Sequence, residues 1–190
     1  TSNPVNRPEA DIYGLGVSLT ANVGGIGLAG NEVDIDTSGG TLSARSDFGN
    51  IYVIETLGNV NLDKVGTGSA YTAFITAATG SILNGNTSGG DNVTSGKTYL
   101  VARDDIGTAA KPLTTAVGNI AALSTLGSTH VTNNGALSVG GVPESGEYAI
   151  DAGTDIVLQT NSPMTVAQNI HAVGNITLRS VDEAAAEGFD

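Results

Sequence analysis

The chain has 190 residues, of which 39% are hydrophobic, only 4% are aromatic and 27 are glycine, with no cysteine and no tryptophan. Its formal net charge of −12 has the wrong sign for binding nucleic-acid phosphates or anionic membrane surfaces, so neither is expected as a partner. No apolar run approaches the roughly 18 residues that a membrane span requires.

Residues 1–10 are polar and hold Pro4 and Pro8, which indicates an extended lead-in or joint. The chain opens on Thr1 without a signal peptide, so we expect a mature piece or a part of something longer. From residue 11 to 180, short runs of alternating apolar and polar residues are separated by turn residues, which predicts β-strands. The strands predicted in the first half are residues 17–23, 33–36, 41–44, 50–54, 59–62, 71–76 and 81–83.

Two loops interrupt the pattern of the second half. Asn84 to Gly96 has few apolar residues and two glycine turns, and Pro143 to Glu147 is a second polar break. The remaining predicted strands are residues 97–102, 119–123, 130–131 and 136–139. Residues 153–179 give the clearest pattern, three strands and two turns with no room for a helix.

Glycines open many of the predicted strands at a spacing of about 19 residues on average, which is typical of repeat architectures. Because each winding of a parallel β-helix buries its inward face only against the next winding, this architecture fits such a period. We predict roughly nine windings over residues 11–180. An antiparallel sandwich or barrel is the alternative all-β fold. The glycines are Gly58, Gly80, Gly96, Gly118, Gly135, Gly153 and Gly174.

Three stretches carry a family resemblance: residues 106–120, residues 130–141 and residues 174–178. They resemble repeat regions of large bacterial surface proteins, the filamentous-haemagglutinin-like and autotransporter-like adhesins. The resemblance is clear over residues 96–180, whereas residues 17–83 resemble such repeats only in their general pattern. It implies a right-handed parallel β-helix that forms an extracellular stalk at the bacterial cell surface, with adhesion as the usual role. The secretion domain of that family is not found in this sequence, so the chain resembles the shaft of such a protein rather than its tip or its export signal.

Several motifs have a functional and a structural interpretation. Gly25 to Gly30 matches the G-x-G-x-x-G dinucleotide fingerprint, but a predicted strand follows it rather than a helix, so a turn is favoured. Asp34 and Asp36 on one strand, with Asp104 and Asp105 at a turn, are candidates for calcium. A solvated acidic face is the favoured alternative, and no cofactor is predicted.

No enzymatic activity is predicted. The two histidines, His130 and His171, lack metal-binding spacing, and Arg103 beside the two aspartates of its turn is the nearest cluster of catalytic residue types. The alternative function is a carbohydrate-binding or polysaccharide-cleaving β-helix, with host or cell-surface glycans as partners. That alternative requires tyrosine and Asp or Arg side chains to converge in one groove. The candidate tyrosines are Tyr13, Tyr52, Tyr71, Tyr99 and Tyr148.

Recurrent turn residues form the predicted structural site. Asparagine follows glycine repeatedly, so stacked side-chain amides between windings are one interpretation and simple turn preference is the other. The candidates are Asn50, Asn59, Asn119, Asn175, Gly118, Gly153 and Gly174.

The ends of the coil are expected to be covered. Residues 181–190 leave the β pattern, and Val181 to Gly188 suits a single helical turn in a terminal joint. An uncovered last winding would expose unpaired N–H and C=O groups. We therefore predict that an adjacent segment of a longer chain, or another copy stacked head to tail, covers the terminal windings. Head-to-tail contacts of this kind build an open filament.

Overall fold

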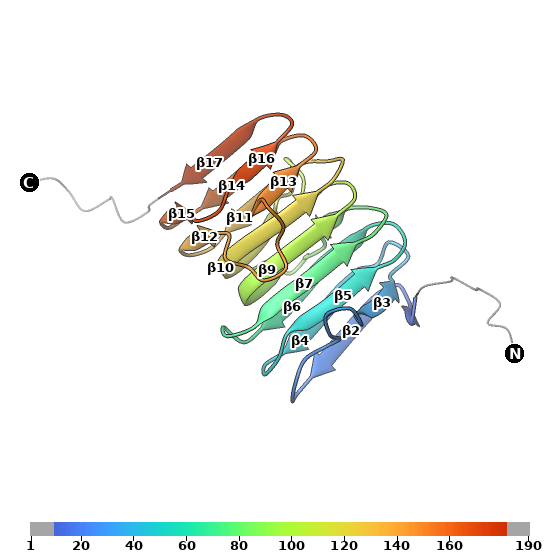
Figure 1. The fold of residues 1–190 in the computed structure, drawn as a ribbon. Helices are drawn as coiled ribbons and strands as arrows, with labels where there is room; N and C mark the ends of the chain where they lie inside the picture. The colour runs from blue at the N-terminus through green and yellow to red at the C-terminus, as the bar shows by residue number, and fades with distance from the viewer. Residues whose placement is uncertain (1–9, 182–190) are drawn as a thin grey trace, which may run out of the picture.

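The computed structural model describes residues 10–181, and within them every regular element is a β-strand. The strands form one 17-stranded sheet that winds into a coil, and all pairings between these strands are parallel. Figure 1 shows strands of successive windings side by side, with the colour running steadily from one end of the stack to the other. The prediction of a right-handed parallel β-helix is confirmed, and the antiparallel sandwich is excluded.

The first face of the coil, face A, is a ladder that runs through the whole stack. Each strand between the two ends pairs with its counterpart one winding earlier and one winding later, whereas the first and last strands pair on one side among the described strands. Its strands are β1 (Ile12–Tyr13), β3 (Val33–Asp36), β5 (Ile51–Glu55), β7 (Thr72–Ala77), the later parts of β9 (Val93–Ala102) and β10 (Leu113–Ser124), β13 (Ile150–Ala152) and β16 (Ile170–Ala172).

Two further faces close the coil. Face B contains β2 (Gly16–Ala21), β4 (Thr41–Ser46), β6 (Val60–Thr67), β8 (Ile82–Asn84), the beginnings of β9 and β10, β11 (Thr129–Asn133), β14 (Ile156–Thr160) and β17 (Ile176–Ser180). Face C contains the beginnings of β5 and β7, the middles of β9 and β10, β12 (Leu137–Val139) and β15 (Met164–Val166). In β5, β7, β9 and β10 the chain runs from face C into face A without interruption.

The interior consists of columns of aliphatic side chains that stack along the coil axis. One column on face B runs through Val60, Ile82 and Ile106, then through Thr129 to Ile156 and Ile176, each aligned with the next by strand pairing. All of these side chains except the last are fully buried or nearly so. The hydroxyl of Thr129 shares a hydrogen bond with Ser124, and no buried side-chain polar atom of the described residues lacks a partner. The narrow interior explains why the composition is rich in branched aliphatic residues and poor in aromatic ones.

The coil has about eight windings rather than the roughly nine expected. The predicted spacing was too short because the seven glycines belong to different corners. Gly80 precedes face B, whereas Gly96 lies within β9 where face B passes into face C, so that interval is shorter than a winding. Eight windings at ~4.8 Å each give a stack about 38 Å long.

The coil carries two loops where the sequence predicted them. The first is residues 85–92, shorter than predicted because Asn84 belongs to β8 and Val93 to β9. The second, residues 140–149, contains the predicted break at Pro143 to Glu147. The predicted lead-in and terminal joint, including the helical turn at Val181 to Gly188, lie outside the described residues apart from Ala10 and Val181.

Candidate functional site

A hydrogen-bonded ladder of side chains follows the corner that leads from face A to face B. In successive windings, a backbone N–H donates to a side-chain oxygen of the winding before it. The donor–acceptor distances lie between 2.6 and 3.4 Å. This corner ladder consists of Asn59, Ser81, Asp105, Ser128, Asp155 and Asn175. It satisfies turn N–H groups that no strand pairing reaches, and it links six windings with short polar side chains of three kinds.

The four predicted asparagines all bond to a neighbouring winding, but not to one another. Asn59 and Asn175 are the two ends of the corner ladder. The Asn50 Oδ1 accepts from the N–H of Thr72 at 2.9 Å, and the Asn119 Nδ2 donates to the carbonyl of Gly140 at 2.8 Å. The amide stacking considered in the sequence is therefore replaced, at these positions, by bonds to other partners.

A direct bond between asparagines occurs elsewhere. The Asn161 Nδ2 donates to the Asn134 Oδ1 at 3.4 Å, and the Asn134 Nδ2 donates to Asp91 at 2.5 Å. Sequence reasoning missed this set. The available signal was that Asn134 and Asn161 each come directly after a face B strand, β11 or β14, which pair in register.

The three predicted glycines are needed because windings approach closely, and none of them has a positive φ. A Cβ at Gly118 would lie 3.0 Å from the carbonyl oxygen of Gly96. A Cβ at Gly153 would overlap the backbone of Thr125, and one at Gly174 would overlap the Asp155 side chain. At these corners a larger residue would push two windings apart.

The motifs with a catalytic or ligand-binding interpretation do not assemble. Arg103 forms a salt bridge with Asp104 at 3.0 Å, while Asp105 belongs to the corner ladder. The stretch Gly25 to Gly30 forms a tight turn that leads to β3, without the helix that dinucleotide binding uses. Among residues 10–181, no three His, Asp or Glu side chains gather as metal ligands would.

Strand β3 does not present the solvated acidic face that the sequence predicted. Asp36 is fully buried, because the chain turns at the end of the strand and brings the carboxylate onto the N–H and hydroxyl of Ser38. Asp34 is half-buried. The two aspartates therefore do not present one water-exposed surface.

The 140–149 loop lies across the outside of the coil and is held by side chains from three windings. The Lys97 Nζ donates to the carbonyl of Gly141 at 2.9 Å, and Asn119 holds Gly140. The Gln168 Nε2 donates to the carbonyl of Gly146 at 2.8 Å and to that of Glu147 at 3.3 Å. These bonds fix the path of the loop over face C.

The loop crosses a column of aromatic rings that point outward from face C. Tyr52 and Phe74 stack with ring centroids 4.2 Å apart, and Tyr99 follows Phe74 in the register. Although outward-facing, Tyr52 and Phe74 are only 8% and 7% exposed. The Tyr52 hydroxyl donates to Glu144 of the loop at 3.5 Å. Tyr52 is therefore covered on the outside of the coil and contacts the loop.

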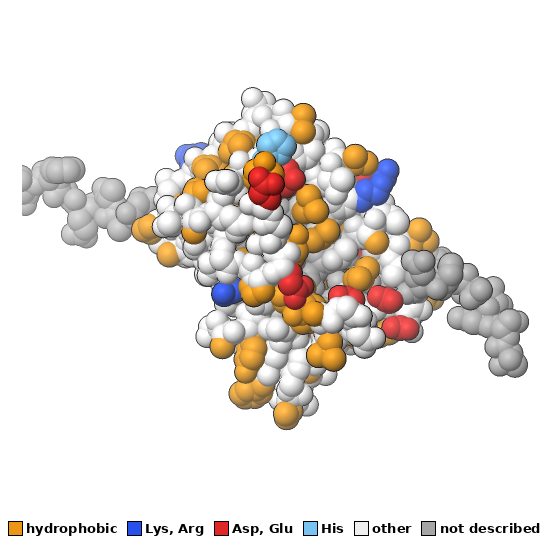
Figure 2. Space-filling model, in the orientation of Figure 1, with side chains coloured by type: hydrophobic (Ala, Val, Ile, Leu, Met, Phe, Trp, Pro, Cys, Tyr) orange, Lys and Arg blue, Asp and Glu red, His pale blue; other side chains and the backbone are white. Residues whose placement is uncertain are grey.

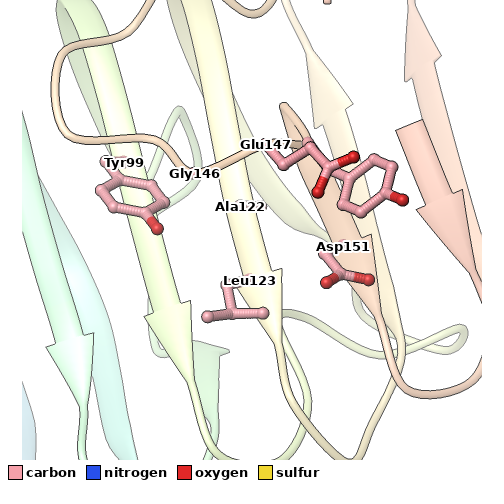
Figure 3. A pocket seen from close by; sticks show the side chains of 7 residues that line it. Tyr99, Ala122, Leu123, Gly146, Glu147 and Asp151 are labelled. Carbon is pink, nitrogen blue, oxygen red and sulfur yellow. The ribbon is translucent and has the colours of Figure 1, made fainter. Parts of the chain in front are cut away.

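A groove of about 240 Å³ lies beside this loop (Figure 3). Figure 3 shows Tyr99 on one side of it, the Asp151 and Glu147 carboxylates on the other, and Leu123 between them. Tyr148 completes the wall, and its ring packs on His171 with centroids 5.1 Å apart. The His171 Nδ1 lies 2.7 Å from the Asp151 Oδ1. The two residues align in the neighbouring face A strands β16 and β13. Figure 2 shows a histidine, carboxylates and hydrophobic side chains together on this side of the molecule.

Acidic side chains line the groove and affect the tyrosines beside it. Burial raises the pKa of Tyr99, and the charge of Glu144 raises it further. The same two causes, in the same order, raise the pKa of Tyr52. Both phenols are therefore neutral at physiological pH, and their rings lie next to a loop that carries two carboxylates, Glu144 and Glu147.

The last winding, formed by β15, β16 and β17, exposes residues that lie in interior columns. Ile176 and Leu178 are 45% and 40% exposed, although they align with Ile156 and Leu158, which are fully buried. Within the described residues, each of these three strands pairs with a strand of the preceding winding only. At this terminal surface, aliphatic residues that belong to the interior columns are exposed.

Comparison with protein-family models, with curated proteins and with solved structures finds no match for the chain. Residues 10–181 contain no helix that is long and apolar enough to cross a membrane.

Proposed function

We propose that this protein is a structural rod, a segment or subunit of an extracellular stalk or filament at the bacterial cell surface that contributes to adhesion. Its last winding packs end to end against the first winding of a second copy. The observation that carries the proposal is the exposure of Ile176 and Leu178 in columns that are otherwise buried.

The geometry of both ends supports stacking between copies. At the first winding, β2 pairs with β4 and with no other strand among those that the structure describes. Placing β2 of a second copy beside β17 would extend the parallel ladder of face B. The added winding would remove apolar surface from water at about 25 cal/mol per Å² and would pair strand edges that otherwise favour unspecific aggregation.

The resemblance supports the extracellular location, and an interior of repeated aliphatic columns is typical of a rod built from stacked windings. The likeness of residues 106–120 and 130–141 to bacterial adhesin repeats favours the surface of a bacterium over other sites.

Sedimentation velocity across a concentration series tests the stacking. The wild type is expected to form larger species as concentration rises. Leu178→Asp should weaken association at least tenfold, because it places a charge in the proposed contact. Leu57→Asp is the matched control: Leu57 is 53% exposed in a turn on the side of the coil, so this variant should associate like the wild type. A wild type that stays monomeric, or equal association of the two variants, would contradict stacking.

Carbohydrate binding is the second candidate, and one observation favours it. Tyr99, Tyr148 and Asp151 converge in one groove, as that alternative required, although no arginine joins them. The rod remains the preferred function because the interior columns and the terminal surface involve the whole chain, whereas the groove involves one side of it.

A further inference from the structure

We propose that the groove between Tyr99 and Tyr148 binds an organic cation, a protonated or quaternary alkylammonium group, with its charge between the tyrosine rings and the carboxylates of Glu147 and Asp151. This site goes beyond the rod function and does not depend on it.

The charges that line the groove favour a cation. Two of the residues that line the groove, Glu147 and Asp151, are acidic, and no lysine or arginine lines it. Glu144 of the same loop adds a third carboxylate nearby, close enough to affect Tyr99. Lys97 is engaged with the carbonyl of Gly141. His171 packs on Tyr148 and orients Asp151 through its Nδ1, which leaves the second oxygen of that carboxylate to other partners.

The aromatic walls of the groove, Tyr99 and Tyr148, also favour a cation. The face of a tyrosine ring carries partial negative charge and attracts a cation within about 6 Å of its centroid. The alkyl groups around the charged nitrogen would also make favourable apolar contact with the half-buried Leu123 on the floor of the groove. This combination of apolar, aromatic and anionic surface matches an alkylated cation at each of its features.

Register sets the width of the site. Tyr99 lies on β9, Leu123 on β10 and Asp151 on β13, so the two walls are separated by two strand spacings of ~4.8 Å. Asp151 is also displaced by two residues along the strand from the position of Tyr99, since Leu123 rather than Ala121 is its partner. A gap of about 10 Å between backbones leaves room for one small group between side chains.

The groove is formed before any ligand arrives. Gln168 holds the carbonyls of Gly146 and Glu147, and Lys97 holds the other end of the loop. Ala149 behind Tyr148 is fully buried, which anchors the loop where it enters β13. Preorganisation reduces the entropy lost on binding.

A neutral sugar fits these observations less well. A sugar ring would use the tyrosine faces and accept or donate hydrogen bonds, but it gains nothing from the concentration of carboxylates without a basic residue. A cation uses both.

Choline and its neutral isostere 3,3-dimethyl-1-butanol distinguish the possibilities, with glucose as the neutral sugar. Binding is followed by NMR through the methyl signals of Leu123 and the ring signals of Tyr99. Choline should give saturable shifts with a dissociation constant in the millimolar range, weakened by added salt. The isostere and glucose should bind at least fivefold more weakly. N-acetyl-lysine methylamide, tested in parallel, reports whether a lysine side chain is an equally good source of the cation.

Glu147→Gln and Tyr99→Leu should each reduce choline affinity by threefold or more. Asp63→Asn, a carboxylate on face B that is bound to Ser43, should leave the affinity unchanged. Equal binding of choline and its isostere would identify a merely apolar groove and overturn the proposal. Binding of glucose without choline would overturn it in favour of a saccharide site, and the absence of saturable shifts with any probe would also overturn it.

Discussion

β14 and β17 occupy equivalent places in successive windings and have nearly the same pattern, Ile-Val-Leu-Gln-Thr and Ile-Thr-Leu-Arg-Ser. They pair in register over all five residues. Every second residue of β14 is buried, whereas all five residues of β17 are exposed. β14 has a strand on each side, and β17 has only β14 among the described strands. Burial in this coil is therefore conferred by the next winding rather than by the sequence of a strand.

The largest expected effect comes from truncating one leucine in each strand. Leu158→Ala should lower the free energy of unfolding by about 3 kcal/mol, because it leaves a cavity in a closed column. Leu178→Ala should lower it by less than about 1 kcal/mol, because that side chain is 40% exposed. Urea denaturation at low protein concentration measures both values. Equal losses would mean that the last winding is already covered in the isolated protein.

The glycines before the two strands extend the comparison to the backbone. Gly153→Ala should destabilise the protein by about 2 kcal/mol, since its Cβ would overlap the Thr125 backbone. Gly174→Ala should have a smaller effect, because the overlapping atom belongs to the Asp155 side chain and the nearest backbone atom, the Thr154 carbonyl oxygen, is 3.0 Å away. Gly16→Ala is the control and should be close to neutral, because a Cβ added at Gly16 would meet no other atom within 4 Å. Thermal unfolding of the three variants ranks them, and an inverted order would disprove close approach as the reason for Gly153.

The corner ladder provides a polar version of the same test. Asp105→Ala removes the acceptor for the N–H of Ser128 inside the stack and should cost about 1 kcal/mol. Asn175→Ala removes an exposed terminal side chain, which should cost less than about 0.5 kcal/mol. Hydrogen exchange at the Ser128 amide should accelerate in the first variant only. Unchanged exchange there would show that the ladder does not protect the corner.

The smallest effect concerns a carboxylate in the interior. Glu55 is fully buried, and burial raises its pKa above 4.5, although hydrogen bonds from Thr37 partly oppose this. Because the folded protein then holds this proton more tightly than the unfolded chain, stability should fall as pH rises from about 4.5 through the folded pKa.

Glu55→Gln should remove this part of the pH dependence, because an amide does not titrate. The exposed Glu147→Gln should retain it. Denaturation midpoints between pH 4 and pH 8 provide the measurement, and identical pH profiles for wild type and Glu55→Gln would exclude a raised pKa at Glu55.

The sequence was sufficient to predict the class of fold, because alternation and glycine turns are local signals. Residues 153–179 were predicted as three strands, around Ile156, Val166 and Ile176, but the middle part contains two short strands, β15 and β16, between β14 and β17. The number of windings was less accessible, since Gly80 and Gly96 look alike in sequence but occupy different corners. The burial of Asp36 was missed because it depends on where the chain turns after β3.

The groove could be predicted only in part. Tyr99 and Tyr148 were both candidates, but they are brought together by a register that connects β9 to β10 and β10 to β13. Glu147 was seen only as the end of a loop. The corner ladder was hidden for a different reason: its members are asparagine, serine and aspartate, so no single residue type repeats at the winding period.

Electron microscopy of the purified chain across a concentration series tests most directly whether the exposed last winding is an interface. We expect rods that lengthen with concentration in steps of about 38 Å, the height of eight windings, and we expect Leu178→Asp to restore single short rods. Separate rods of one length at every concentration, for the wild type as for Leu178→Asp, would contradict this expectation.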